Sequence, residues 1–177
     1  MLVFLRNGPS VQANSEPLPW VSAPPLEGYR EIDFTCGLSV NFPNVIDGSP
    51  VRLDRGEEFI SFAPATAVAM AREGDTVLAA GDNAGLVAAK AEVYVFASFD
   101  RCKTFERLAV LPTSHAGMSA TKVVVTGDEF RIEVHNAERR AAPDAFVWKP
   151  LRGLPWPFHR HGGAYLSRNR GRTWSME

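Results

Sequence analysis

Two eight-residue segments of this sequence follow one pattern, and they constrain the fold more than any other feature. Residues 98–105 read SFDRCKTF and residues 167–174 read SRNRGRTW, so both fit Ser-x-(Asp/Asn)-x-x-x-Thr-aromatic. Each octet follows an apolar stretch that contains a tyrosine, at 93–97 and 163–166. Serine and Asx side chains bond backbone groups inside tight turns, and threonine and aromatic residues suit the strand that leaves the turn. The pattern therefore predicts two β-hairpins with closely similar turns.

The octets resemble the Asp-box, also called the BNR repeat, of sialidase-like β-propellers. In that family the box forms the hairpin between the last two strands of a blade, and it is a structural element rather than an active site. The resemblance implies a structural role for Ser98, Asp100, Thr104, Phe105, Ser167, Asn169, Gly171, Thr173 and Trp174. Two positions depart from the usual box, because Cys102 stands where glycine is usual and Asn169 stands where aspartate is usual.

Short apolar or alternating segments fill much of the remaining chain, separated by 13 prolines and 14 glycines. Such punctuation is typical of many short strands joined by turns. We predict strands at 29–35, 38–42, 58–62, 76–80, 92–98, 104–111, 122–126, 129–135, 164–167 and 173–176. The alanine-rich segment 65–72 fits a short helix and a buried strand equally well.

These segments predict an all-β protein of consecutive antiparallel meanders, which form a small or incomplete β-propeller-like domain over residues 29–177. Residues 1–28 are predicted to be an irregular N-terminal arm, because 8–27 holds five prolines, and Trp20 is its candidate anchor. A weak internal repeat aligns VLAAGD at 77–82 with VVVTGD at 123–128, and an insertion at 136–162 lengthens the second copy.

Composition bounds the partners and the compartment. The chain has 19 Lys and Arg against 20 Asp and Glu, a net charge of −1 that argues against a nucleic-acid partner. No apolar run is long enough to span a bilayer. The apolar start is too short for a signal peptide, so the chain as given is expected to be cytoplasmic, or periplasmic if a signal peptide has been removed. Cys36 and Cys102 are two buried thiols or one disulfide, which needs an oxidising compartment.

We predict neither enzymatic activity nor a cofactor. Sialidases of this fold have about six blades, three arginines that clamp a carboxylate, a Tyr–Glu nucleophile pair and an acid/base aspartate. The nearest match to their arginine motif is FRIE at 130–133, which lies between the octets, and Arg131 is interpreted as an outward residue of a strand. No carboxylate pair stands out by spacing, and the sequence has no nucleophile elbow and no phosphate-binding glycine motif.

Two segments are candidates for contact with a partner protein. Residues 152–172 are rich in arginine and aromatic residues and contain no acidic residue, a composition enriched at interfaces. Another polar loop follows the first octet. The candidate contact residues are Arg152, Trp156, Phe158, His159, Arg160, His161, Ser114 and His115. His159 and His161 lack a third ligand nearby, so no metal site is predicted. Ser114 and His115 are adjacent in sequence and would point apart on an extended chain, so we predict no nucleophile–base pair.

Three functions remain open. The first is a non-catalytic protein-binding module, and a looser resemblance to short Asp-box immunity proteins of bacterial type VI secretion suggests that it neutralises a cognate toxin, such as a hydrolase. That resemblance rests on the cysteine-bearing strand at 34–37 followed by the first octet. The second is a carbohydrate-binding or carbohydrate-active protein that uses Trp148 and Trp156. The third is a structural domain that oligomerises through its sheet edges.

Overall fold

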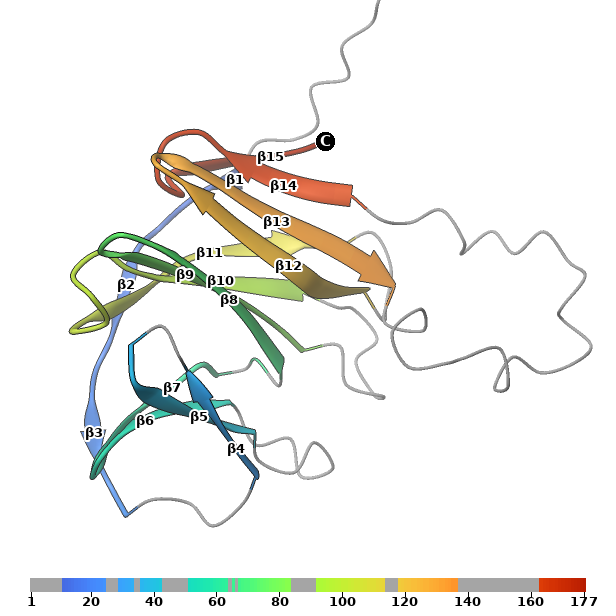
Figure 1. Cartoon of the computed structure of the whole chain (residues 1–177). Helices are drawn as coiled ribbons and strands as arrows, with labels where there is room; N and C mark the ends of the chain where they lie inside the picture. The colour runs from blue at the N-terminus through green and yellow to red at the C-terminus, as the bar shows by residue number, and fades with distance from the viewer. Residues whose placement is uncertain are drawn as a thin grey trace, which may run out of the picture.

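The computed structural model describes residues 11–24, 29–33, 36–42, 51–63, 65, 67–83, 92–113, 118–136 and 163–177, and these residues form fifteen strands and no helix. Twelve of the strands make three antiparallel meanders of four strands each, and the meanders are stacked as layers (Figure 1). The prediction of an all-β protein built from consecutive antiparallel meanders is confirmed. No closure of the sheets into a ring is identified among the described residues.

Each meander forms its own sheet. The first sheet contains β4 (Tyr29–Asp33), β5 (Leu38–Phe42), β6 (Arg52–Arg55) and β7 (Glu58–Ser61). The middle sheet contains β8 (Ala67–Glu73), β9 (Thr76–Asp82), β10 (Glu92–Ser98) and β11 (Phe105–Pro112). The third sheet contains β12 (Met118–Thr126), β13 (Glu129–Asn136), β14 (Gly163–Ser167) and β15 (Thr173–Met176). Segment 65–72, which the sequence left open between helix and strand, thus lies largely in β8.

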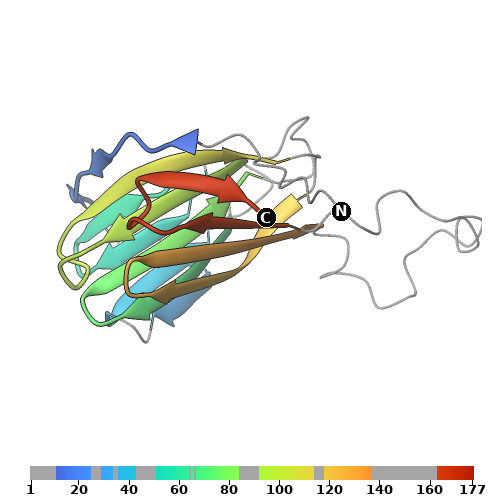
Figure 2. The ribbon, with the colours of Figure 1, turned by 90° about the horizontal axis from the view of Figure 1, so that it is seen from above.

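A fifth strand joins the outer edge of each sheet, and all three come from the N-terminal segment. β1 (Val11–Gln12) pairs with β15, β2 (Glu16–Leu18) with β11, and β3 (Val21–Ser22) with β7. This segment, residues 11–22, which we call the strap, therefore crosses the three sheets in the reverse of their chain order (Figure 2). The expectation of an irregular arm is corrected over these residues. Backbone pairing to exposed sheet edges, which needs no hydrophobic pattern, forms these strands despite the prolines.

The middle sheet is buried on both faces because the other two sheets pack against it. Along β9, Val77 and Ala79 belong to the core cluster shared with the first sheet, whereas Leu78 and Ala80 belong to the cluster shared with the third. β10 alternates in the same way. A continuous apolar run is the pattern expected for a strand covered on both sides.

The two outward faces of the stack carry charge. On the third sheet, the Arg131 side chain points outward as predicted, and its Nη1 lies 2.6 Å from the Glu177 carboxylate. On the first sheet, Arg52 and Asp54 form a buried ion pair of 2.8 Å, and the Arg52 guanidinium lies over the Phe59 ring at 3.7 Å. On the third sheet, a further layer would have to desolvate the exposed Arg131 and Glu177, and such a polar face limits a stack of repeating units.

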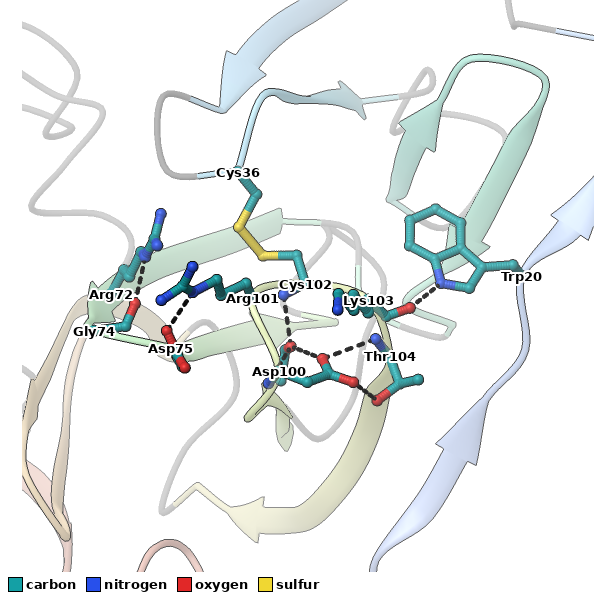
Figure 3. Close-up of a disulfide and its surroundings, with 11 residues drawn as sticks. Trp20, Cys36, Arg72, Gly74, Asp75, Asp100, Arg101, Cys102, Lys103 and Thr104 are labelled. Atoms are coloured by element: carbon teal, nitrogen blue, oxygen red, sulfur yellow. Dashed lines mark hydrogen bonds and ion pairs between the residues drawn. A yellow bond between two sulfur atoms is a disulfide. The ribbon is translucent and has the colours of Figure 1, made fainter.

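A disulfide and an indole fasten the first sheet to the middle sheet. Cys36, beside the β4–β5 turn, is bonded to Cys102 in the first octet (Figure 3). The structure therefore selects the disulfide over the two free thiols that the sequence also allowed. Trp20 of the strap donates its indole N–H to the Lys103 carbonyl over 2.7 Å, and the Arg55 guanidinium covers its ring at 3.8 Å. Trp20 therefore anchors the strap, as predicted.

The internal repeat is present in the structure with a different alignment. Gly74 and Gly127 occupy the β8–β9 and β12–β13 turns, with φ values of 58° and 56°, and each is followed by an aspartate. Gly81 and Asp82, which the sequence analysis matched to the second turn, lie inside β9 and pair with β10. The alignment was wrong because both Gly-Asp pairs follow apolar stretches, but Gly81 and Asp82 are the last paired residues of β9, whereas Gly127 and Asp128 form a turn.

Candidate functional site: the groove between the octet turns

The first octet is a turn whose polar side chains bond one another. The Ser98 hydroxyl accepts a hydrogen bond from the Cys102 N–H at 2.9 Å and donates one to the Asp100 carboxylate at 2.9 Å. Asp100 in turn accepts from the Thr104 N–H at 2.9 Å and from the Thr104 hydroxyl at 2.6 Å (Figure 3). These contacts replace the ladder bonds that a six-residue turn cannot make.

The second octet repeats this network. Ser167 accepts from the Gly171 N–H at 2.8 Å and donates to the Asn169 side-chain oxygen at 3.0 Å. Asn169 accepts from the Thr173 N–H at 2.9 Å, and its amide nitrogen donates to the Thr173 hydroxyl at 2.9 Å. Asparagine therefore reproduces the aspartate geometry with the direction of one hydrogen bond reversed.

Both turns pass through two consecutive left-handed residues. These are Arg101 and Cys102 in the first octet, with φ values of 59° and 63°, and Arg170 and Gly171 in the second, at 56° and 81°. Glycine adopts this conformation without steric cost, whereas a residue with a Cβ atom pays about 1 kcal/mol for it. At Gly171 the close packing adds a second requirement, because a Cβ atom there would lie 2.5 Å from Leu108 Cδ1.

We expect Gly171→Ala to destabilise the protein more than Gly127→Ala does. Both glycines have positive φ, but a Cβ at Gly127 would meet nothing within 4 Å. The control should lose about 1 kcal/mol for backbone strain alone, and Gly171→Ala about 2–3 kcal/mol because Leu108 must also move. Urea unfolding of both variants measures the difference. Equal losses would show that Leu108 yields freely.

Hydrogen bonding makes Asp100 a stronger acid than usual. Burial raises the pKa of its carboxyl, but the hydrogen bonds from Thr104, Ser98 and the Lys103 N–H together outweigh burial and hold the pKa below its ordinary value of 3.8. A folded pKa below the unfolded one stabilises the fold above pH about 4, and this stabilisation is lost as the pH falls through the folded pKa. The second octet has no titrating group at this position.

The dependence of stability on pH should therefore be set by whether the third octet position is aspartate or asparagine. We expect Asp100→Asn to be less stable than the wild type at pH 7, by roughly 1 kcal/mol, and the gap to close toward pH 3. Asn169→Asp is the mirror-image control, which should gain stability at pH 7 and lose that gain toward pH 3. Unfolding by urea at several pH values measures both. A gap that does not change with pH would contradict the lowered pKa.

Each octet is also held by the first hairpin of its own sheet. The Arg101 N–H donates to the Asp75 carbonyl at 3.1 Å, and the two side chains form an ion pair. In the third sheet the Arg170 N–H donates to the Asp128 carbonyl at 2.9 Å, with the side chains 3.7 Å apart. The four turns involved lie at one end of the stack, on the left of Figure 1.

A groove of about 430 Å³ lies between the two octets where the strap crosses them. Its lining combines arginines of the second octet, apolar residues of the middle sheet and a carboxylate. The lining residues are Ala13, Ser15, Phe99, Glu106, Leu108, Arg170, Gly171 and Arg172. The strap is fixed over it by hydrogen bonds from the Ala13 N–H to the Arg172 carbonyl, 2.9 Å, and from the Asn14 N–H to the Leu108 carbonyl, 3.1 Å.

The charges around the groove are unevenly paired. Arg170 faces Asp128, and its guanidinium lies 4.7 Å from the centroid of the Phe99 ring. Arg172 is exposed and Glu106 on β11 is half-buried, and neither has an ion-pair partner among the described residues. Among the described residues, the groove therefore presents one cation and one carboxylate without ion-pair partners, beside an apolar surface.

Comparison with protein-family models, curated proteins and solved structures found no match. The groove is therefore a candidate site on the basis of its own geometry alone. No helix among the described residues is long and apolar enough to cross a membrane. No cluster of three metal-ligating side chains occurs within the described ranges.

The structure does not place the residues that the sequence singled out for partner contact. Arg152, Trp156, Phe158, His159, Arg160, His161, Ser114 and His115 all lie outside the described residues, as does Trp148. The described strand ends that flank their segments lie at the end of the stack opposite the octet turns. Sequence reasoning missed the groove because its lining comes from three distant segments. The alternating Arg168, Arg170 and Arg172 were the available signal.

Proposed function

We propose that this chain is a non-catalytic protein-binding module, and that it acts as an immunity protein which neutralises a cognate bacterial toxin by binding it. The single observation that carries the proposal is that the polar and the arginine side chains of the octet turns have different roles. The serine, Asx and threonine groups of both turns bond one another, while Arg170 and Arg172 of the second octet line the groove. Arginine next to an aromatic ring is a composition enriched at protein interfaces.

We further propose that the three meanders are blades of an incomplete propeller and that the octets are its Asp-boxes. Two features support this. Each octet joins the third and fourth strands of its meander, which is the place of the box in a propeller blade. The first meander carries a short turn at Gly56 in the equivalent position, so its blade would lack a box.

Affinity capture from a lysate of the native host tests the proposal. The tagged wild type should retain one protein in a 1:1 ratio, as measured by light scattering of the eluted complex. A matched variant with both groove arginines reversed, Arg170→Glu with Arg172→Glu, should lose it while unfolding at nearly the same urea concentration. Co-expression should then protect cells from the captured protein. A wild type that captures nothing would contradict the proposed function.

A further inference from the structure

We infer that the groove between the octet turns recognises an acidic, extended segment of its partner, with a carboxylate against Arg172 and an apolar side chain on Phe99 and Leu108. This inference rests on the proposed function and names the chemistry of the partner. It follows from the pairing of charges around the groove, from the apolar floor and from the position of Glu106.

The arginines of the octets differ in how far their charge is compensated. Arg101 pairs with Asp75, Arg168 lies 3.8 Å from the Glu129 carboxylate, and Arg170 lies 3.7 Å from Asp128. Arg172 has no such partner within the part of the chain that the structure describes. Judged from the described residues, Arg172 is thus the groove guanidinium available to an incoming carboxylate, which a planar guanidinium can receive through two parallel hydrogen bonds.

The apolar floor of the groove favours an occupant that also carries apolar side chains. Phe99 is only half-buried and supplies most of this apolar surface, whereas Leu108, also in the lining, is a core residue that is 5% exposed. The Arg170 guanidinium over the Phe99 ring holds one wall in place, since a cation attracted to a ring face loses conformational freedom. The hydrogen bonds of the strap and the turn likewise preform the groove, which lowers the ordering cost of binding.

Removing the charge of Glu106 should change the affinity for an acidic ligand in the opposite direction to removing the charge of Arg172. It is the only carboxylate among the lining residues, and no described residue pairs with it. A like charge beside the site repels an acidic ligand, so removing it should strengthen binding. A purely structural role of these residues would not produce a gain of affinity.

The experiment uses the full chain and three probes: a capped pentapeptide of alternating aspartate and leucine, its lysine–leucine counterpart, and an oligothymidine. Amide chemical-shift titration at low salt should show the acidic peptide shifting Phe99, Leu108, Gly171 and Arg172. Arg172→Gln should weaken this binding about three- to tenfold, and Glu106→Gln should strengthen it about threefold. Arg168→Gln, which lies outside the groove, should leave it unchanged. Raising the salt concentration should weaken binding.

Several outcomes would overturn the inference: equal or tighter binding of the lysine–leucine peptide, shifts confined to another surface, or Arg172→Gln and Glu106→Gln changing affinity in the same direction. Tighter binding of the oligothymidine would assign the groove to nucleic acid instead. The proposed function fails separately. If a partner is captured and still binds the groove variants, the protein is a binding module but the groove is not its binding site. If the peptide results are as expected but no partner is captured, the groove binds acidic segments but the proposed function is wrong.

Discussion

Removing the Cys36–Cys102 disulfide is expected to lower the free energy of unfolding by about 4 kcal/mol, the entropy of closing a loop of this length in the unfolded chain. The two cysteines are 66 positions apart and join different sheets, so the bond restricts much of the unfolded chain. The variant Cys36→Ala with Cys102→Ala, compared with the oxidised wild type by urea unfolding, measures the loss.

A second variant separates the effect of losing the disulfide from the effect of backbone strain at residue 102. Cys102 has a φ of 63°, which costs a non-glycine residue about 1 kcal/mol. Cys36→Ala with Cys102→Gly should therefore recover about 1 kcal/mol relative to the double alanine variant. If the glycine variant were no more stable, the left-handed conformation at 102 would be an effect of the disulfide and not of the octet turn.

Trp174→Ala should destabilise the protein by about 3–5 kcal/mol, the range for removing a large buried aromatic side chain. Trp174 is 1% exposed, tilts against Phe130 and donates its indole N–H to the Gly171 carbonyl at 2.9 Å. The loss would thus fall on the core between the middle and third sheets and on the second octet together. Thermal and urea unfolding both measure it.

Trp174→Phe is the matched control. It keeps most of the apolar contact and removes the indole N–H, so the Gly171 carbonyl loses its partner and the expected loss is about 1–2 kcal/mol. An alanine variant no worse than the phenylalanine variant would mean that the hydrogen bond, and not the packing, holds this side chain in place.

The octet hairpins and most strands could be predicted from the sequence because their signals are local. A serine, an Asx residue and a threonine at fixed spacing bond within one turn, so nothing distant is needed to specify it. Segments in which apolar and polar residues alternate, such as 129–135, likewise indicate which face of the strand is buried. Strand β9 is recognisable by a continuous apolar run, although the run alone does not say which two sheets cover it.

Other features depended on contacts that no short window contains. β6 reads Arg-Leu-Asp-Arg, which has no strand-like composition, yet Arg52 and Asp54 are 8% and 5% exposed because they neutralise each other on one face while Leu53 fills the core on the other. The strap strands follow from edges elsewhere in the chain. The groove needs the strap, β11 and the second octet assembled before it exists.

The strap also orders events during synthesis. Its three pairing sites appear in succession as the chain leaves the ribosome: β7 first, then β11, and finally β15 close to the C-terminus. Residues 21–22 can dock as soon as the first meander has formed, whereas Val11 must wait for Trp174. If the segments of the strap dock as their partners are made, residues 21–22 would dock first and residues 11–12 last, after Thr173 and Trp174 have been made. A chain truncated before β15 would keep Arg170 and Arg172, but it would lack Trp174 and the sheet edge to which β1 pairs.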